Sequence, residues 1–195
     1  MDVTVMDVAD PRVARSRAAV LATAVDIVVE RGPAALTIEA VVARSGVARS
    51  TIYRHWPTRD DLLVDVFRFG APSPHIPDAS LPFVDAMRAF LHDLVDQLSD
   101  PKWARILPAL LALKAYEPTL AAIDDHLESE QAAVSGDLLA RGVSEGVLDP
   151  AIDHRRAIAQ LVGPLVFALI TGEPALTPEL ADESLRCFLA GQRRS

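Results

Sequence analysis

The sequence has only one cysteine, Cys187, among its 195 residues. A single thiol excludes an internal disulfide, and it cannot supply the several cysteines of a structural zinc site. The sequence also has no glycine-rich phosphate loop and no serine elbow, which are signatures of two large groups of enzymes. These absences fit a protein of the reducing cytoplasm. We interpret Cys187, which stands among Leu185, Phe188 and Leu189, as a buried apolar residue.

Long hydrophobic runs are also lacking. The longest, Leu161–Ile170, is far shorter than the roughly 20 residues that span a bilayer, so we expect no membrane partner. The first residues have no positive start followed by an apolar core, and we expect no secretory signal. Half of the residues are nonetheless hydrophobic, enough for a sizeable core.

Charge is distributed unevenly along a chain whose net charge is −8. Residues 12–59 contain eight arginines and three acidic residues and so have a net charge of +5, whereas residues 60–195 have −10. Residues 1–11 have −3, and we expect them to form a flexible acidic tail. A basic segment joined to an acidic remainder indicates that nucleic acid would contact one part of the molecule only.

The segment Thr37–Trp56 has the pattern of two short helices joined at a glycine. Thr37 can cap the first helix, and Glu39 suits the positive end of its dipole. Gly46 tolerates the left-handed backbone of a tight turn, and Val47 supplies an apolar side chain between two steeply crossed helices. The pattern predicts a helix-turn-helix.

The second helix of this pair keeps Ile52 for the core and directs polar side chains outward. Arginine can bind guanine edges with two hydrogen bonds, hydroxyl groups reach bases or phosphates, and a short helix fits the major groove of DNA. The outward residues are Arg49, Ser50, Arg54 and His55, beside Thr51 and Tyr53. The same pattern is compatible with a solvated helical hairpin, so these residues alone leave both interpretations open.

The residues that follow favour the first interpretation. The segment Trp56–Leu63, with the sequence WPTRDDLL, resembles the aromatic-Pro-Ser-Lys-acid-acid-Leu-Leu segment after the recognition helix in the tetracycline-repressor (TetR) family. The GPAALTI entry at Gly32–Ile38 and the turn at Gly46 are similar as well, so the resemblance covers residues 12–68. Ala48 departs from it, because the family usually has a serine or a similar cap there.

This resemblance implies an all-α protein in which residues 12–68 form a three-helix DNA-binding domain and residues 80–195 a helical ligand-binding and dimerisation domain. The chain would be a cytoplasmic homodimer on a palindromic DNA operator, released by an unidentified small molecule and needing no cofactor. Base edges would lie nearest Arg49, Ser50 and Thr51. Phosphate contacts would come from Thr37, Tyr53, His55 and Arg59, and the DNA-binding set also includes Arg44 and Arg54.

The rest of the chain has helical periodicity and repeated start signals. Residues 70–78 contain three prolines and cannot form a helix, so we place the domain boundary there. Thr58, with Asp61 three residues later, predicts a capped connector helix before this boundary. Capping residues stand shortly before a proline at Ser80, Asp100, Asp149 and Thr177. The periodicity predicts helices at 81–98, 101–115, 118–141, 150–171 and 178–191.

The helix expected at 150–171 is apolar nearly all round between Ala157 and Ile170, so every side of it must be covered. A single bundle is one way to cover it. The resemblance implies another, in which this helix and the one at 178–191 pack against a second subunit.

Two apolar sets occur on the helices after the boundary. Most such residues are plain core in any helical bundle, but the resemblance implies that they enclose a cavity for a largely apolar small molecule. The residues are Phe83, Met87, Phe90, Leu94, Trp103, Leu107, Leu110, Leu111 and Tyr116, with His126 as a polar partner.

Acidic residues and histidines gather around His92–Asp96 and Asp124–Glu130. Their spacing matches no recognised metal motif and does not separate a ligand set from a solvated face, so we expect no metal site and no catalytic site. An architectural or ligand-independent DNA-binding protein is the alternative function, and an enzyme is less favoured. A purely architectural protein would not need a large apolar carboxyl-terminal domain.

Overall fold

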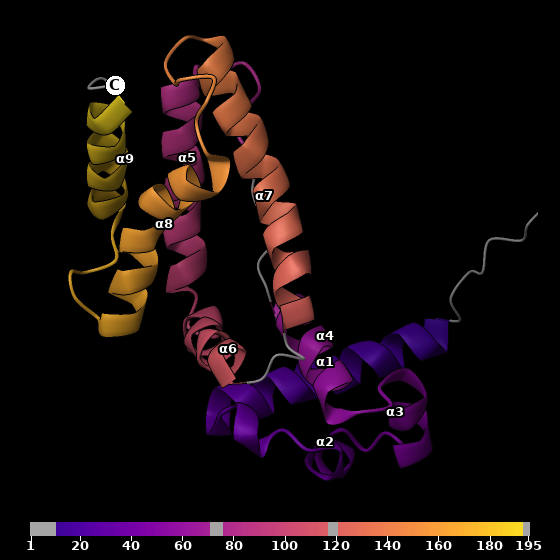
Figure 1. Cartoon of the computed structure of the whole chain (residues 1–195). Coiled ribbons are helices and arrows are strands. Elements are labelled where there is room, and N and C mark those ends of the chain that lie inside the picture. The colour runs from indigo at the N-terminus through magenta and orange to yellow at the C-terminus, as the bar shows by residue number, and fades with distance from the viewer. Residues whose placement is uncertain (1–10, 71–75, 117–120, 193–195) are drawn as a thin grey trace, which may run out of the picture. The chain divides into compact units, whose positions relative to one another are not determined.

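The computed structural model describes residues 11–70, 76–116 and 121–192, without the side chains at 11, 12, 110, 113–116 and 121–132. All regular structure in these ranges is helical, and they contain no strand, so the all-α prediction is confirmed (Figure 1). The expected acidic tail, most of the proline-rich linker and the side chains of Leu110, Tyr116 and His126 lie outside the described residues. None of the described helices is long and apolar enough to cross a membrane.

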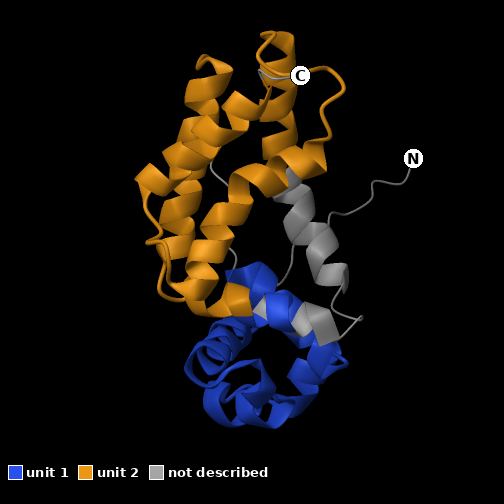
Figure 2. Cartoon of the chain, turned by 60° about the vertical axis from the view of Figure 1, so that its left-hand side comes forward, with its two compact units in different colours: residues 1–70, 109–123 blue, residues 71–108, 124–195 orange. Residues whose placement is uncertain are grey.

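The chain forms two compact units, which Figure 2 shows in different colours. The first contains residues 1–70 and 109–123, and the second contains residues 71–108 and 124–195. Of the three breaks between them, the first lies at the start of the proline-rich segment, the second lies within α6 (Trp103–Tyr116) and the third lies near the start of α7 (Ala121–Ser144). Each unit has its own set of packed helices.

The first unit is organised around α1 (Pro11–Arg31), which contacts η1 (Pro33–Ala35), α2 (Ile38–Ser45) and α4 (Arg59–Gly70). The helix α3 (Arg49–His55) packs on α2. Apolar side chains recur along α1 at helical spacing and meet those of the shorter helices. The buried residues are Val20, Leu21, Ala24, Val25, Ile27, Val28, Leu36, Ile38, Val41, Ile52, Trp56, Leu62, Leu63, Val66 and Phe67.

The start of α4 has the predicted capping box. The Thr58 amide donates a hydrogen bond of 3.0 Å to Asp61 Oδ2, and the Asp61 amide donates one of 3.1 Å to Thr58 Oγ1. These reciprocal bonds satisfy two amides that the first helical turn leaves without partners. The predicted capped start of this helix is confirmed.

The second unit contains α5 (Phe83–Ser99), α7 (Ala121–Ser144) in its larger part, α8 (His154–Thr171) and α9 (Pro178–Gln192). The helices α5, α8 and α9 pack on one another. Their buried side chains recur every three or four residues, so the residues that face the common core lie on one side of each helix. The buried residues on these three helices are Phe83, Ala86, Met87, Phe90, Leu91, Leu94, Val95, Leu98, Ala157, Leu161, Leu165, Ala168, Ala181, Ser184, Leu185 and Phe188.

Two of the four predicted helix starts are confirmed. Asp100 Oδ1 accepts hydrogen bonds of 2.9 Å from the amides of Lys102 and Trp103 at the start of α6. Thr177 Oγ1 accepts one of 3.4 Å from the Leu180 amide at the start of α9. Both caps lie within three residues of the amides that they satisfy, so the local sequence is enough to predict them.

The starts assigned to Ser80 and Asp149 are wrong. At α5 the Phe83 amide donates to both carboxylate oxygens of Glu145, at 3.1 and 2.9 Å, so a residue 62 positions away caps the helix. Asp149 Oδ1 accepts from the Ala151 amide at 2.7 Å in a turn. The helix α8 begins later, where Asp153 accepts from the Arg156 amide at 3.0 Å.

Candidate nucleic-acid interface

The first helix of the helix-turn-helix, α2, is defined by its two ends. Thr37 Oγ1 accepts a hydrogen bond of 3.1 Å from the Ala40 amide, as predicted. At the other end Gly46 has φ +69°, in the left-handed region, and its amide donates to the Val42 carbonyl at 3.1 Å. A side chain at Gly46 would meet no atom within 4 Å, so glycine is favoured there by the backbone conformation alone.

The second helix, α3, is anchored by Ile52, which is fully buried, and by Trp56, the buried residue that follows its last turn. Ala48 stands at the N-cap position and makes no side-chain cap, as its departure from the family pattern implies. The outer face of α3 consists of Arg49, Ser50, Tyr53 and Arg54, all exposed, with Thr51 and His55 half-buried. A short helix fixed on its apolar side thus presents a basic and hydroxyl-bearing face.

Arg49 makes contacts on both helices of the motif. Its Nη2 group donates to the carboxylate of Glu39 on α2 and to the hydroxyl of Tyr53 at 3.3 Å. Its guanidinium carbon lies 5.4 Å from the centre of the Tyr53 ring. The Tyr53 hydroxyl and then the charge of Glu39 raise the pKa of Arg49 above its ordinary value.

The other predicted residues differ in how far they are held by the fold. Arg44 forms two hydrogen bonds with Glu30 of α1, at 2.5 and 2.6 Å, which raise the pKa of Arg44 and lower that of Glu30. Arg59 donates from Nε to the Leu36 carbonyl and from Nη2 to the Pro33 carbonyl, both at 2.9 Å. Arg44 thus joins α2 to α1, and Arg59 joins α4 to η1 and the residue after it. The contacts of both arginines with DNA stay predictions.

His55 lies at the end of α3 with its ring tilted against Trp56, the ring centres being 5.6 Å apart. Its Nε2 atom is buried and has no hydrogen-bond partner among the described residues. Buried imidazole nitrogens usually have a partner, and among the described residues this is the buried side-chain nitrogen that lacks one. The expected phosphate contact of His55 would supply one, and it also stays a prediction.

Asp65 on α4 is a residue that the sequence analysis missed. Its Oδ2 atom accepts 2.9 Å from Trp56 Nε1 and 2.6 Å from Arg17 Nη2, and Oδ1 lies 3.5 Å from Arg68. Through these contacts α1, α4 and the end of α3 share one carboxylate. The available signal was an acidic residue between Val64 and Val66 on an otherwise apolar stretch of the connector helix.

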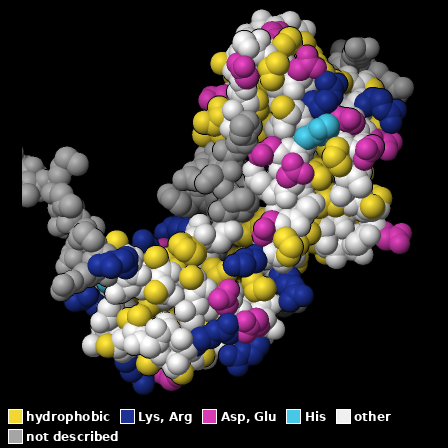
Figure 3. All heavy atoms as spheres, turned by 180° about the vertical axis from the view of Figure 1, so that it is seen from behind, with side chains coloured by type: hydrophobic (Ala, Val, Ile, Leu, Met, Phe, Trp, Pro, Cys, Tyr) yellow, Lys and Arg dark blue, Asp and Glu magenta, His cyan; other side chains and the backbone are white. Residues whose placement is uncertain are grey.

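Positive charge gathers on the first unit. On the face drawn in Figure 3, arginine side chains are frequent over the helices of the first unit, whereas acidic side chains are more frequent over those of the second. Residues 12–59, which all lie in the first unit, have a net charge of +5. A surface of this kind attracts the phosphate backbone of DNA.

The residues expected to line a ligand cavity occupy the core of the second unit and α6. Phe83, Met87, Phe90, Leu94 and Trp103 are buried. Leu107 is half-buried and Leu111 is exposed by 37%. Within the described residues no group of three histidine, cysteine or acidic side chains is placed to hold a metal ion.

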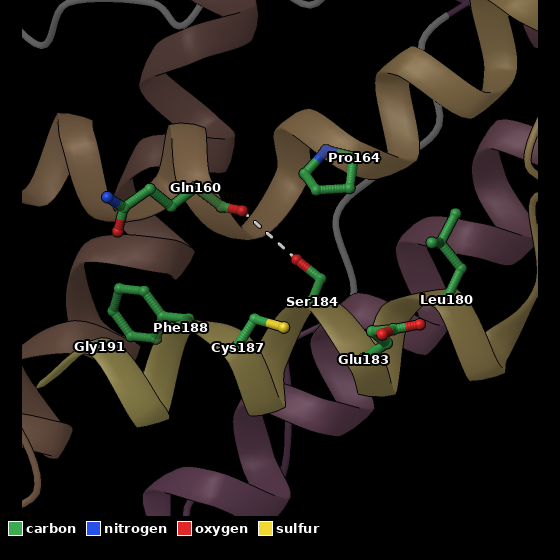
Figure 4. A pocket seen from close by; sticks show the side chains of 8 residues that line it. All are labelled: Gln160, Pro164, Leu180, Glu183, Ser184, Cys187, Phe188 and Gly191. Carbon is green, nitrogen blue, oxygen red and sulfur yellow. Dashed lines mark hydrogen bonds between the residues drawn. The ribbon is translucent and has the colours of Figure 1, made fainter. Parts of the chain in front are cut away.

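A groove of about 320 Å³ lies between α8 and α9 (Figure 4). Ser184 on α9 donates to the Leu161 carbonyl at 2.8 Å and to the Gln160 carbonyl at 3.3 Å, which joins the two helices at its floor. Cys187 also lines the groove and is exposed, so the prediction of a buried thiol is wrong. The stripe of α9 that reaches the core passes through Ser184 and Phe188, which leaves Cys187 on the outer side.

The outer side of α8 is apolar as well. Phe167 is exposed by 59% and Ile170 by 54%, and Gly163 and Pro164 on the same side are exposed. The sequence analysis predicted a helix that is apolar nearly all round, and in the described part of the chain its outer stripe is exposed. Side chains of this size are seldom exposed together unless something packs on them.

A basic, exposed helix-turn-helix joined to a larger helical unit defines a class of protein, the DNA-binding transcriptional regulators. Two family models match the chain: "Bacterial regulatory proteins, tetR family" over residues 20–66 and "Tetracyclin repressor-like, C-terminal domain" over residues 82–187. The chain belongs to the TetR family of transcriptional regulators, as the resemblance of its amino-terminal motif implies. It is a regulator and not an enzyme.

Similar proteins agree with this assignment. The HTH-type transcriptional regulator YdeS of Bacillus subtilis (strain 168) is 24% identical over 187 residues, 95% of this chain and 94% of YdeS. The TetR family transcription regulator SCO0332 has a similar structure, with a TM-score of 0.68 and 23% identity over 91% of this chain and 98% of that one. The structure of the SmeT–triclosan complex matches with a TM-score of 0.67 and 22% identity over 91% of each chain.

Proposed function

We propose that the protein is a homodimeric repressor that binds a palindromic operator and is released from it by a small, largely apolar molecule. The observation that carries the proposal is the outer face of α3, where Arg49, Ser50, Tyr53 and Arg54 are exposed on a helix anchored by Ile52. Residues of these types bind base edges and phosphates, and a helix of this length fits one major groove.

The dimer is supported by the uncovered stripe of α8 and the adjoining groove of α9. Pro164, Phe167 and Thr171 succeed one another at helical spacing on the exposed side of α8, and Gln160 continues the stripe by one turn. A second copy that packs α8 and α9 against the same helices would cover this apolar surface by two-fold symmetry. The two recognition helices would then enter successive major grooves, roughly 34 Å apart, on one face of the DNA.

Release by a ligand is supported by two features. Five of the predicted ligand residues, Phe83, Met87, Phe90, Leu94 and Trp103, are apolar and buried on α5 or at the start of α6, and a protein of the same fold, SmeT, forms a complex with triclosan. A ligand can release the operator only if it binds more tightly to a dimer arrangement whose recognition helices do not match the half-sites. The helix α4, which leads out of the first unit at Gly70, is the segment through which such a change would pass.

Selection from a random duplex pool, followed by binding titrations, tests the DNA-binding part. We expect a two-fold symmetric consensus, a complex of two chains per duplex and an affinity that falls steeply with salt. A monomeric protein at micromolar concentration, or a pool with no enriched sequence, would refute the proposal.

Thermal melting with a panel of small molecules tests the ligand part. A specific ligand at 100 times its Kd should stabilise the protein by about 2.7 kcal/mol and raise its Tm. The same compound should then weaken operator binding. If operator binding is tight and no compound affects it, the alternative of a ligand-independent DNA-binding protein is favoured.

A further inference from the structure

Glu39 is an acidic residue at the face where the helix-turn-helix would meet DNA. It lies in the first turn of α2, its side chain is exposed by 61%, and its carboxylate accepts a hydrogen bond from Arg49 Nη2 on α3. Arg49 is the first residue of α3, and its side chain is exposed by 57%. An acid at this place repels the phosphates of any DNA sequence, so it needs a reason other than affinity.

Stability is a weak reason. An ion pair between two exposed side chains contributes little to folding, because solvent screens the charges and both side chains lose rotamer freedom. The carboxylate also interacts favourably with the positive, amino-terminal end of the α2 dipole. Thr37 already caps that end through the hydrogen bond from the Ala40 amide. The contact between Glu39 and Arg49 therefore affects the position of the Arg49 guanidinium more than it affects folding stability.

The guanidinium of Arg49 is held from two sides. Both the Glu39 carboxylate and the Tyr53 hydroxyl accept from Nη2, and the Tyr53 ring lies 5.4 Å from the guanidinium carbon. The N–H groups on Nε and Nη1 have no partner in the described part of the chain and stay available to another acceptor. Arg54, exposed on the same helix, has no such partner among the described residues. Arg49 is therefore the arginine of α3 whose direction is set before DNA arrives.

We propose that Glu39 is a specificity-determining residue, which orients Arg49 toward a single base pair and lowers the affinity of the protein for all other DNA. The inference rests on the proposed DNA-binding function. An oriented guanidinium loses less rotamer freedom when it binds a guanine edge, and it fits a phosphate or another base less well. The carboxylate adds a repulsion that every sequence meets and that only the matching base pair offsets through Arg49.

The test compares wild type, Glu39→Gln, Glu30→Gln, Arg49→Ala and the double variant with both Glu39→Gln and Arg49→Ala on three kinds of duplex. These are the operator selected with wild type, the same operator changed one base pair at a time, and a random duplex of equal length, all at one salt concentration. Glu30→Gln is the matched control, because it also removes one negative charge and the partner of an arginine, Arg44, on the other side of α2. Far-ultraviolet circular dichroism and melting curves establish that each variant is folded.

For Glu39→Gln we expect random DNA to bind about threefold more tightly and the ratio of operator to random affinity to fall by about tenfold, the range of a partly lost base contact. The loss should be concentrated at the base pair whose discrimination Arg49→Ala removes. In the Arg49→Ala background, Glu39→Gln should cause no further loss there, because Glu39 acts through Arg49. Glu30→Gln should leave the ratio within about twofold of wild type.

An unchanged ratio for Glu39→Gln overturns the inference, and so does an equal fall for Glu30→Gln. Further loss at one base pair for Glu39→Gln in the Arg49→Ala background also overturns it, since Glu39 would then contact the base itself. These results leave the proposed function standing. A wild-type protein that enriches no sequence refutes the proposed function, and the inference falls with it.

Discussion

Phe167→Ala on α8 is expected to weaken the proposed dimer strongly. Phe167 is exposed by 59%, which for an aromatic side chain of roughly 200 Å² leaves about 120 Å² of surface to be covered by a partner. At about 25 cal/mol per Å² its burial stabilises the dimer by about 3 kcal/mol, of which alanine would keep about a third. Two-fold symmetry puts two copies in the interface, so the loss is about 4 kcal/mol, or about 1,000-fold in dimer Kd.

Sedimentation velocity over a range of concentrations measures this Kd directly. The thiol of Cys187 supplies a second readout, because it lines the neighbouring groove and is exposed in the single chain. We expect a maleimide to react slowly with the wild-type dimer and rapidly with dilute Phe167→Ala. Ile76→Ala is the matched control, since Ile76 is even more exposed, at 75%, and lies outside α8 and α9.

The loss of translational and rotational freedom on association is the same for wild type and variant, so it cancels in the ratio of their Kd values. A Kd for Phe167→Ala within threefold of wild type would contradict the reasoning. So would an equal loss for Ile76→Ala, which would place the interface elsewhere or attribute the effect to general surface hydrophobicity. In either case α8 would not be the helix that a second copy covers.

Three further predictions concern the DNA-binding face, acid stability and the ligand. Arg49→Ala should weaken operator binding by about 5- to 150-fold and leave random DNA nearly unchanged, whereas Arg59→Ala should weaken both alike. Arg59→Ala should also lower the free energy of unfolding by about 1 to 2 kcal/mol in urea titrations, because two carbonyl groups lose a charged donor. An unchanged free energy of unfolding would contradict this second role. The Arg156 amide lowers the pKa of Asp153 below its ordinary value of 3.8, so this carboxylate stabilises the fold above that pH and the stabilisation is lost as pH falls through the lower folded-state pKa. The Tm measured from pH 5 to pH 2 should therefore fall less with pH for Asp153→Asn than for wild type. An equal fall in Tm for the two proteins would contradict the assignment. Phe90→Ala, at a core position exposed by 7%, should raise the inducer concentration needed for release and keep ligand-free operator affinity within about threefold, provided that the variant folds; an unchanged inducer midpoint would remove α5 from the ligand site.

Some features of this protein follow from short stretches of its sequence. The caps at Thr37 and at Thr58 with Asp61 join groups three residues apart. Gly46 is favoured because its backbone is in the left-handed conformation, which glycine adopts most easily. Hydrogen bonds over such distances form with any tertiary arrangement that keeps the helix, so residue type and spacing are enough to predict them. The helix-turn-helix, the family and the exposed face of α3 follow from the same local information.

Other features were decided by the tertiary structure. Arg59 binds carbonyls 23 and 26 residues away, Glu145 caps a helix 62 residues away, and Asp65 joins Trp56 to Arg17. Nothing in the spacing of these residues marks them as partners, because only the packing of α1, η1, α4, α5 and the segment after α7 brings them together. The exposure of Cys187 was likewise decided by which stripe of α9 meets α8, since a helix with apolar residues on several sides can turn more than one of them to the core.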